Sequence, residues 1–288
     1  MATSDDLRDW IAGQVRSRVA GPDAVERHGV FDTNGADRWF DDDAVICRVH
    51  ADSAMFVGGL RALLLQSLHP LAMAGVADHS DYRADPWGRL QRTAYFLAAT
   101  TFGSAEQAEQ AIARVRTVHR HVTGIAPDGR PYRADDPHLL RWVHVAEVDS
   151  FLAAYRRYGG EDLSDAEADE YVAQMATIAR ALGVPAPPET VRSLADQLRS
   201  FRPELSGTRQ ARDVARYLLW QPPMSLAARA PYGVLAASAV GLLPRWARRP
   251  LGLPWFPVAE TVVVRPAGDA VTRTLRWALR PPPGEVGR

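Results

Sequence analysis

The sequence contains no lysine, so all 34 of its basic residues are arginines. This absence excludes a lysine Schiff base, a lysine general base and a lysine metal ligand. Cys47 is the only cysteine, which excludes intramolecular disulfides, thiolate metal clusters and CxxC redox chemistry. Because Cys47 lies in the apolar stretch 44–49, we expect it to be a small buried residue rather than a reactive thiol.

An excess of positive charge and a long apolar run are also absent. The 34 acidic residues balance the 34 basic ones, which argues against a nucleic-acid partner. Residues 1–18 carry three aspartates before any apolar run and lack the order of a secretory signal. No window reaches the roughly 18–20 apolar residues of a membrane-spanning helix. We therefore expect a cytoplasmic protein.

The stretch nearest to a membrane segment is 232–244, which is rich in Ala, Val, Leu and Gly and is followed by three arginines. A run of this length is typical of a core helix, and we interpret it so. An interfacial position is the alternative, which would give the protein a peripheral contact with a membrane.

Several catalytic motifs are missing as well. The sequence has no HExxH, no GxxxxGK[ST], no convincing GxGxxG and no GxSxG, which disfavours hydrolase and nucleotide-binding functions. His144 and Glu147 stand at i, i+3, but a di-iron bundle would need a second such pair and two more carboxylates. We find no second pair.

The sequence does contain several signals for the start of a helix. Asp-Pro steps predict an N-cap followed by proline at the first helical position, and Ser-x-x-Gln/Glu predicts a capping box. These signals are Asp85-Pro86, Asp136-Pro137, Ser104 with Gln107, and Ser164 with Glu167. Between them the apolar residues repeat at helical spacing, and only 124–136 could hold a short hairpin or a turn.

This pattern predicts an all-α protein of about ten helices. Without an internal repeat or a long linker, the simplest organisation is one globular domain over residues 1–288. In it, the motif-rich region is 52–160, and the C-terminal helices of 208–280 complete the fold.

The first candidate site is Arg89-x-x-Arg92-Thr93, whose three residues share one helix face at i, i+3 and i+4. Apolar residues continue that face one turn later, so we expect it to be partly buried. Two arginines on a buried face need anions. These could be acidic residues such as Asp81 or Asp85, or the carboxylates of a bound cofactor.

His119 is the second candidate, because it extends an apolar helical stripe through Ile112 and Val115. Such a histidine is either a hydrogen-bonded core residue or a metal ligand. His121 lies two residues on, about 200° round the helix. We therefore expect the two rings to point apart and not to share one metal.

Asp78 and His79 are the third candidate; with Asp81 they cluster in the segment that begins with His69-Pro70 and follows the apolar helix of 55–68. A capping or turn role would explain them. A role as general base, or as the group that positions a water molecule, is the alternative.

Taken in order, the short motifs of this sequence resemble those of the MpaB-type oxygenase family, which includes the latex-clearing rubber oxygenases. The matching motifs are Leu68-His69-Pro70, Ala77-Asp78-His79-Ser80, Asp85-Pro86, Arg89-x-x-Arg92-Thr93, His119-x-x-Val122-x-Gly124, Pro131-Tyr132-x-Ala134-x-Asp136-Pro137 and Trp142-Val143-His144. The stretches 162–184 and 241–255 also resemble ordinary bacterial members, so the resemblance covers most of the chain.

The resemblance implies an all-helical fold around a buried b-type haem, with His119 as the axial iron ligand. It also implies that Arg89 and Thr93 lie beside the haem, and that O₂ attacks an apolar substrate, for example a polyprenyl chain. Arg92, like Arg89, would anchor a propionate or polarise bound oxygen. The alternative that the residues leave open is a helical protein that carries haem or a lipid without turning it over.

Two departures from the rubber-cleaving members stand out. Those members can hold a distal lysine just before the threonine, where this chain has Arg92; arginine stays protonated and cannot donate a lone pair to iron. We therefore expect a distal side that is open, water-filled or closed by another residue. They also hold a glutamate base upstream of the arginine, whereas residues 71–77 contain no carboxylate. Asp78 or His79 is the candidate replacement for that base.

Overall fold

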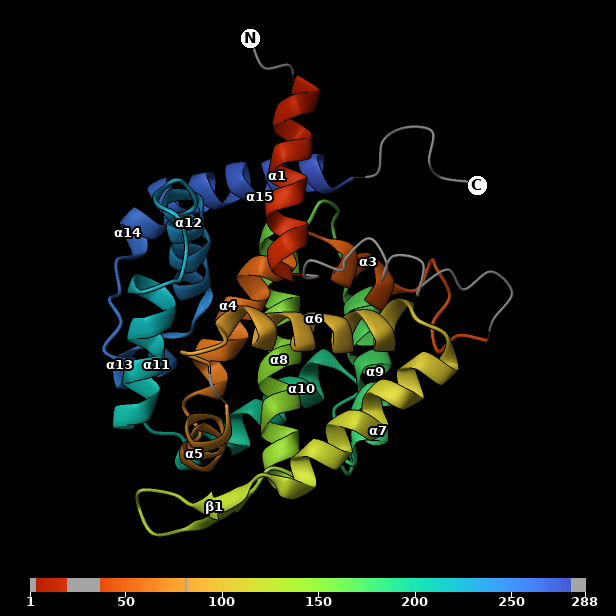
Figure 1. Ribbon diagram of the computed structural model, residues 1–288, viewed down its shortest axis with the longest axis vertical. Helices are drawn as coiled ribbons and strands as arrows, with labels where there is room; N and C mark the ends of the chain where they lie inside the picture. Colours follow the sequence, from red (N-terminus) through yellow and green to blue (C-terminus); the bar gives the residue numbers. More distant parts are fainter. Residues whose placement is uncertain (1–3, 20–36, 81, 281–288) are drawn as a thin grey trace.

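The computed structural model describes residues 4–19, 37–80 and 82–280. Most of these residues are helical, and their one small sheet has two strands, which confirms the all-α prediction (Figure 1). The longer helices are α1 (Ser4–Val19), α4 (Ala54–Gln66), α5 (Pro70–His79), α6 (Pro86–Phe102), α7 (Ala105–His121), α8 (Pro137–Tyr158), α9 (Asp165–Leu182), α10 (Val191–Ser200), α11 (Arg209–Trp220), α12 (Leu226–Leu242) and α15 (Arg265–Leu279). The shorter ones are α3 (Val45–Ala51), η2 (Arg202–Glu204), α13 (Arg245–Leu251), α14 (Pro257–Ala259) and η3 (Glu260–Val264).

The helix-start signals of the sequence are confirmed. The Asp85 carboxylate accepts a hydrogen bond from the Gly88 N–H, and Asp136 accepts one from His138. Both predicted capping boxes are complete, at the starts of α7 and α9. Of the two alternatives for 124–136, a short hairpin or a turn, the structure has the hairpin, because β1 (Thr123–Ile125) pairs antiparallel with β2 (Pro131–Arg133).

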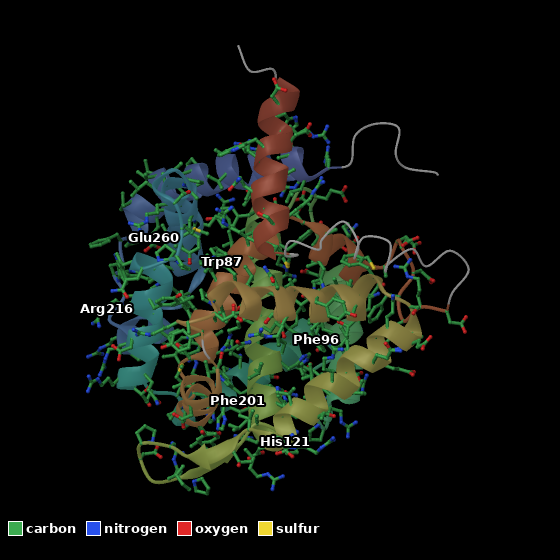
Figure 2. The ribbon with its side chains drawn as sticks, viewed as in Figure 1. Trp87, Phe96, His121, Phe201, Arg216 and Glu260 are labelled. Carbon is green, nitrogen blue, oxygen red and sulfur yellow. The ribbon has the colours of Figure 1, made fainter. Side chains whose placement is uncertain are left out.

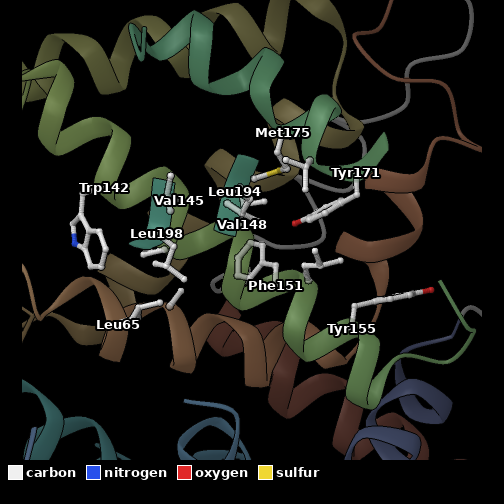
Figure 3. Close-up of a cluster of buried hydrophobic side chains, with 14 of the residues drawn as sticks. Leu65, Trp142, Val145, Val148, Phe151, Tyr155, Tyr171, Met175, Leu194 and Leu198 are labelled. Atoms are coloured by element: carbon white, nitrogen blue, oxygen red, sulfur yellow. The ribbon is translucent and has the colours of Figure 1, made fainter. Parts of the chain in front are cut away.

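Helix α8 forms the centre of the core, and other helices pack on several of its sides. Figure 3 shows its apolar side chains meeting those of α4, α9 and α10. Helix α4 approaches α8 closely at Gly58, where an added Cβ would lie 2.9 Å from the Phe151 Cδ1 atom. Close helix packing therefore explains Gly58, while a Cβ on Gly59 would meet nothing within 4 Å. The predicted burial of Cys47 is confirmed, with its Sγ 3.6 Å from the Thr101 carbonyl oxygen.

Most of the segment 232–244 belongs to α12, where Leu235, Ala236, Ser238 and Ala239 are buried, in agreement with the predicted core helix. The exposed turns of α12, which begin at Leu226, precede this segment. In the described ranges, no single helix is both long enough and apolar enough to cross a membrane. Two pairs of successive helices satisfy length and composition together but are bent by 107° (α4 with α5) and 119° (α12 with α13).

Candidate functional site

Helices α6 and α7 diverge from a tight connection at Gly103-Ser104, as Figure 1 shows. A Cβ on Gly103 would lie 2.5 Å from the Ala99 carbonyl oxygen, so only glycine fits there. Arg89 lies 14 residues before Gly103, and His119 lies 15 residues after Ser104. At about 1.5 Å of rise per residue, both lie roughly 21–23 Å from the connection. The two principal candidates therefore stand at matching positions along two diverging helices.

A cavity of about 480 Å³ opens where the C-terminal end of α5 meets the N-terminal half of α6. Its lining residues are His79, Ser80, Asp85, Arg89, Arg92 and Thr93. The structure thus brings together four of the six predicted site residues, from two helices. Asp78 and His119 are not part of this lining.

Arg89 is the half-buried cation of this cavity, and its guanidinium donates a hydrogen bond to the Ser80 hydroxyl. Burial, together with the charge of Arg92, lowers the pKa of Arg89. No carboxylate within residues 37–80 and 82–280 forms an ion pair with Arg89. Of its two predicted partners, Asp85 pairs with Arg92, and Asp81 lies outside the described residues. Arg89 therefore presents a desolvated positive charge to the cavity.

The other α6 residues of the cavity are more exposed. The Arg92 Nη1 atom lies 3.2 Å from the Asp85 Oδ2 atom in an exposed ion pair, so its charge is already partly neutralised. The Thr93 hydroxyl donates to the Arg89 carbonyl oxygen at 3.1 Å, which leaves its oxygen lone pairs free to accept a hydrogen bond.

His119 and His121 occupy different environments, as their separation round the helix predicts. His119 is half-buried. Burial lowers its pKa, although the negative charge of Asp135 acts in the opposite direction. The ring is therefore neutral at physiological pH and keeps a nitrogen lone pair for a metal. His121 is exposed, with its Nδ1 2.8 Å from the Thr117 carbonyl oxygen (Figure 2).

Asp78 and His79 both contact the hairpin. The Tyr132 hydroxyl donates to the Asp78 Oδ2 atom at 2.6 Å; burial, with a smaller contribution from Asp78, raises the pKa of Tyr132 to about 12. The His79 Nε2 atom lies 3.1 Å from the Thr123 carbonyl oxygen. Asp78 thus anchors the hairpin to α5, whereas His79 reaches both the hairpin and the cavity. A role for either as a base stays a prediction.

Sequence reasoning gave little weight to two polar residues on one face of α8, the buried His144 and the half-buried Glu147. The His144 Nε2 atom is buried and has no hydrogen-bond partner in the described part of the chain. Burial raises the pKa of the Glu147 carboxyl to about 7, in a range where it can both accept and release a proton. The signal that could have identified them is the i, i+3 His-Glu pair inside an apolar helix. Neither residue lines the cavity beside Arg89.

A further cluster joins residues far apart in the sequence: His69, His138 and Glu204, whose ligand atoms lie within 4.8 Å of one another. The His138 Nε2 atom is 2.8 Å, and the His69 Nε2 atom 3.4 Å, from the Glu204 Oε2 atom. The His69 Nδ1 atom accepts from the Ala72 N–H, which places the ring proton on Nε2. A metal at Nε2 would need the opposite tautomer, so this geometry favours a hydrogen-bonded link between α5, α8 and η2.

With this geometry established, comparison with known proteins gives the class of the protein. A family model described as ER-bound oxygenase mpaB/B'/Rubber oxygenase, catalytic domain, matches residues 47–279. Because the match covers most of the chain, the chain belongs to this family of oxygenase catalytic domains, which confirms the predicted family. No curated protein and no solved structure matches the chain.

Proposed function

We propose that this protein is a haem b-dependent oxygenase that acts with O₂ on an apolar, isoprenoid-like substrate. The observation that carries the proposal is Arg89, a half-buried cation that lines a cavity with no carboxylate partner in the described chain. A haem brings two propionates, and arginine suits carboxylates because its planar fork can donate two parallel hydrogen bonds. The membership of an oxygenase family supports the same conclusion.

The chemistry of the donor groups on α6 and α7 supports this proposal. His119 offers a neutral imidazole nitrogen, a common ligand of haem iron, at the position along α7 that matches Arg89 along α6. When bound, the haem would supply the activation of O₂, and the protein would supply ligation, shape and electrostatics. His119 would hold the iron, and Arg89 would hold a propionate.

The remaining residues of the cavity have distinct tasks in this proposal. Thr93 would donate its hydroxyl proton to a propionate or a water molecule in place of the Arg89 carbonyl oxygen. Arg92 keeps its proton at any accessible pH, so it would polarise an oxygen atom by its charge and would not ligate iron. His79, which lines the cavity beside them, would accept or donate a proton there. Asp78 would position His79 indirectly, by fixing the hairpin to α5.

The test is the optical spectrum of the purified full-length protein and of two matched variants. We expect a Soret band from the wild-type protein and its loss, or a strong shift, in His119→Ala. His121→Ala is the control, because His121 lies two residues away on the exposed side of the same helix. Equal haem content and identical spectra in both variants would remove His119 from the proposal.

Turnover is tested separately, by O₂ uptake with a reductant and a series of polyprenyl substrates. We expect substrate-dependent uptake that is lost in Arg89→Ala and His119→Ala but kept in His121→Ala. A stable Soret band without uptake across the series would instead favour a protein that carries haem without turning it over.

A further inference from the structure

Exposed apolar side chains gather in the C-terminal part of the chain. Their exposed fractions are high, for example 81% for Leu226 and 75% for Val258. The members of this group are Trp220, Leu226, Trp255, Phe256, Val258, Val262 and Val263. Single exposed apolar residues are ordinary, but a group of this size marks an interaction surface.

These residues lie on elements that pack against each other. Helix α12 contacts both α11 and η3, and α11 also contacts α13. Figures 1 and 2 show α11, α12, α13 and α14 together along one side of the molecule, with Arg216 and Glu260 labelled there. The elements that carry the exposed apolar residues therefore lie together on one side of the molecule.

This C-terminal segment carries a large excess of positive charge. Residues 205–268 contain eight arginines against two acidic residues, Asp213 and Glu260, a net charge of +6 in a chain whose net charge is zero. Both acidic residues are already paired, Asp213 with Arg216 and Glu260 with Arg248. The exposed arginines left over include Arg212, Arg229, Arg245, Arg249 and Arg265.

The exposed stretch 254–263 is held in place from beneath by the buried Arg248. Its guanidinium donates to the carbonyl oxygens of Leu243, Gly241 and Pro254 and to the Glu260 carboxylate. The Arg248 Cζ atom also lies 4.4 Å from the centre of the Trp255 ring. The apolar side chains of this stretch are thus presented to solvent on a fixed backbone.

We propose that this side of the molecule, the basic apolar face (the exposed residues of 209–265 named above), binds the interface of a membrane rich in anionic phospholipid. Tryptophan and phenylalanine partition into the headgroup region, and arginines add attraction to anionic headgroups. Phospholipid is the partner that satisfies both features, since a neutral apolar partner would leave the excess positive charge uncompensated. The proposal does not depend on haem binding.

The test is co-sedimentation of the full-length protein with vesicles of phosphatidylcholine alone or mixed with phosphatidylglycerol. We expect the bound fraction to rise with phosphatidylglycerol and to fall between about 0.1 M and 1 M salt, where the Debye length shrinks from about 10 Å to 3 Å. The triple variant Phe256→Ser, Val262→Ser, Val263→Ser should lose binding. Ile125→Ser, at an equally exposed apolar residue of the hairpin, is the matched control and should bind as the wild type does.

Charge is tested in the same assay. Arg245→Gln and Arg249→Gln should each weaken binding to the mixed vesicles about fivefold, which corresponds to about 1 kcal/mol for each arginine. Arg192→Gln, on the exposed surface of α10, should have no effect. Circular dichroism and thermal unfolding of each variant verify that the fold is kept.

Two results would overturn the proposal. One is vesicle binding that does not depend on phosphatidylglycerol, or that falls equally in the variants of the basic apolar face and in their controls. The other is a dimer in sedimentation velocity that the triple variant dissociates while vesicle binding stays unchanged. The face would then be a contact between two copies of this chain.

Discussion

Two arginines of this molecule show opposite ways of placing a positive charge inside a protein. Arg248 is buried and saturated, because three carbonyl oxygens, one carboxylate and an indole ring surround its guanidinium. Arg89 is half-buried beside a cavity, and in the described chain its hydrogen-bond partner is a serine hydroxyl. Burying a charge is costly unless it is paired, so the second arrangement makes sense when a ligand supplies the missing anion.

We interpret Arg248 as a structural arginine, and we propose that Arg89 binds a ligand. Both residues come from arginine-rich helical segments, and their sequence contexts look alike. The local partners decide the role. The comparison therefore predicts large effects on stability at Arg248 and small effects on stability, but large effects on ligand retention, at Arg89.

The largest expected effect is that of Arg248→Ala. Removing the guanidinium leaves the Glu260 carboxylate without its partner and frees the 254–263 stretch, which should lower the free energy of unfolding by about 3–5 kcal/mol. Urea unfolding measures it, with the exposed Arg249→Ala as control, expected within about 0.5 kcal/mol of wild type. A loss below about 1 kcal/mol would contradict the structural role of Arg248.

Glu147→Gln should stabilise the protein at neutral and alkaline pH. The pKa of Glu147 is raised to about 7 in the folded state, so the native protein binds this proton more tightly than the unfolded chain does. Stability from this group is present below the ordinary pKa near 4.5 and is lost as the pH rises to about 7. The variant should gain about 1–3 kcal/mol at pH 8 and little at pH 4. A gain independent of pH would mean that the Glu147 charge is not its cause.

Arg89→Ala tests the proposed role of Arg89 in ligand binding. We expect its free energy of unfolding without haem to stay within about 1 kcal/mol of wild type, since no carboxylate of the described chain loses a partner. Haem should nevertheless leave the variant faster, as measured by transfer to an excess of apomyoglobin. A stability loss equal to that of Arg248→Ala would mean that Arg89 is a structural residue.

Arg92→Ala should have the smallest effect. Its exposed ion pair with Asp85 contributes about 0–1 kcal/mol to stability. Because Asp85 already neutralises part of its charge, haem should leave this variant more slowly than it leaves Arg89→Ala. The same transfer experiment ranks the two variants, and the reverse order would assign the propionate to Arg92.

Much of the fold could be predicted from the sequence because its signals are local. Asp85, Ser104, Asp136 and Ser164 each satisfy backbone N–H groups within three residues, so their roles do not depend on the rest of the chain. The apolar residues between these caps repeat at helical spacing, which is also a local signal, and it predicts the all-α class. The cytoplasmic location and the lack of a nucleic-acid partner stay predictions from composition alone.

The site was predictable only in part, because its decisive contacts are between distant residues. Spacing on α6 grouped Arg89, Arg92 and Thr93, but it could not tell which arginine Asp85 pairs with. Asp78 and Tyr132, which form a hydrogen bond, are 54 residues apart in the sequence, and His69 and Glu204 are 135 residues apart. The sequence shows Glu147 three residues after His144, but the raised pKa of Glu147 comes from burial in the folded protein, which spacing alone does not reveal.

The connection at Gly103-Ser104 has a mechanical consequence for the helices that it joins. Each arm extends about 21 Å to its key residue, so a pivot of about 5° at the glycine would displace Arg89 relative to His119 by about 2 Å. The glycine has no room for a side chain, and the capping box locks the first turn beyond it. A few atoms at this connection therefore set the separation between Arg89 and His119, although both residues lie far from it.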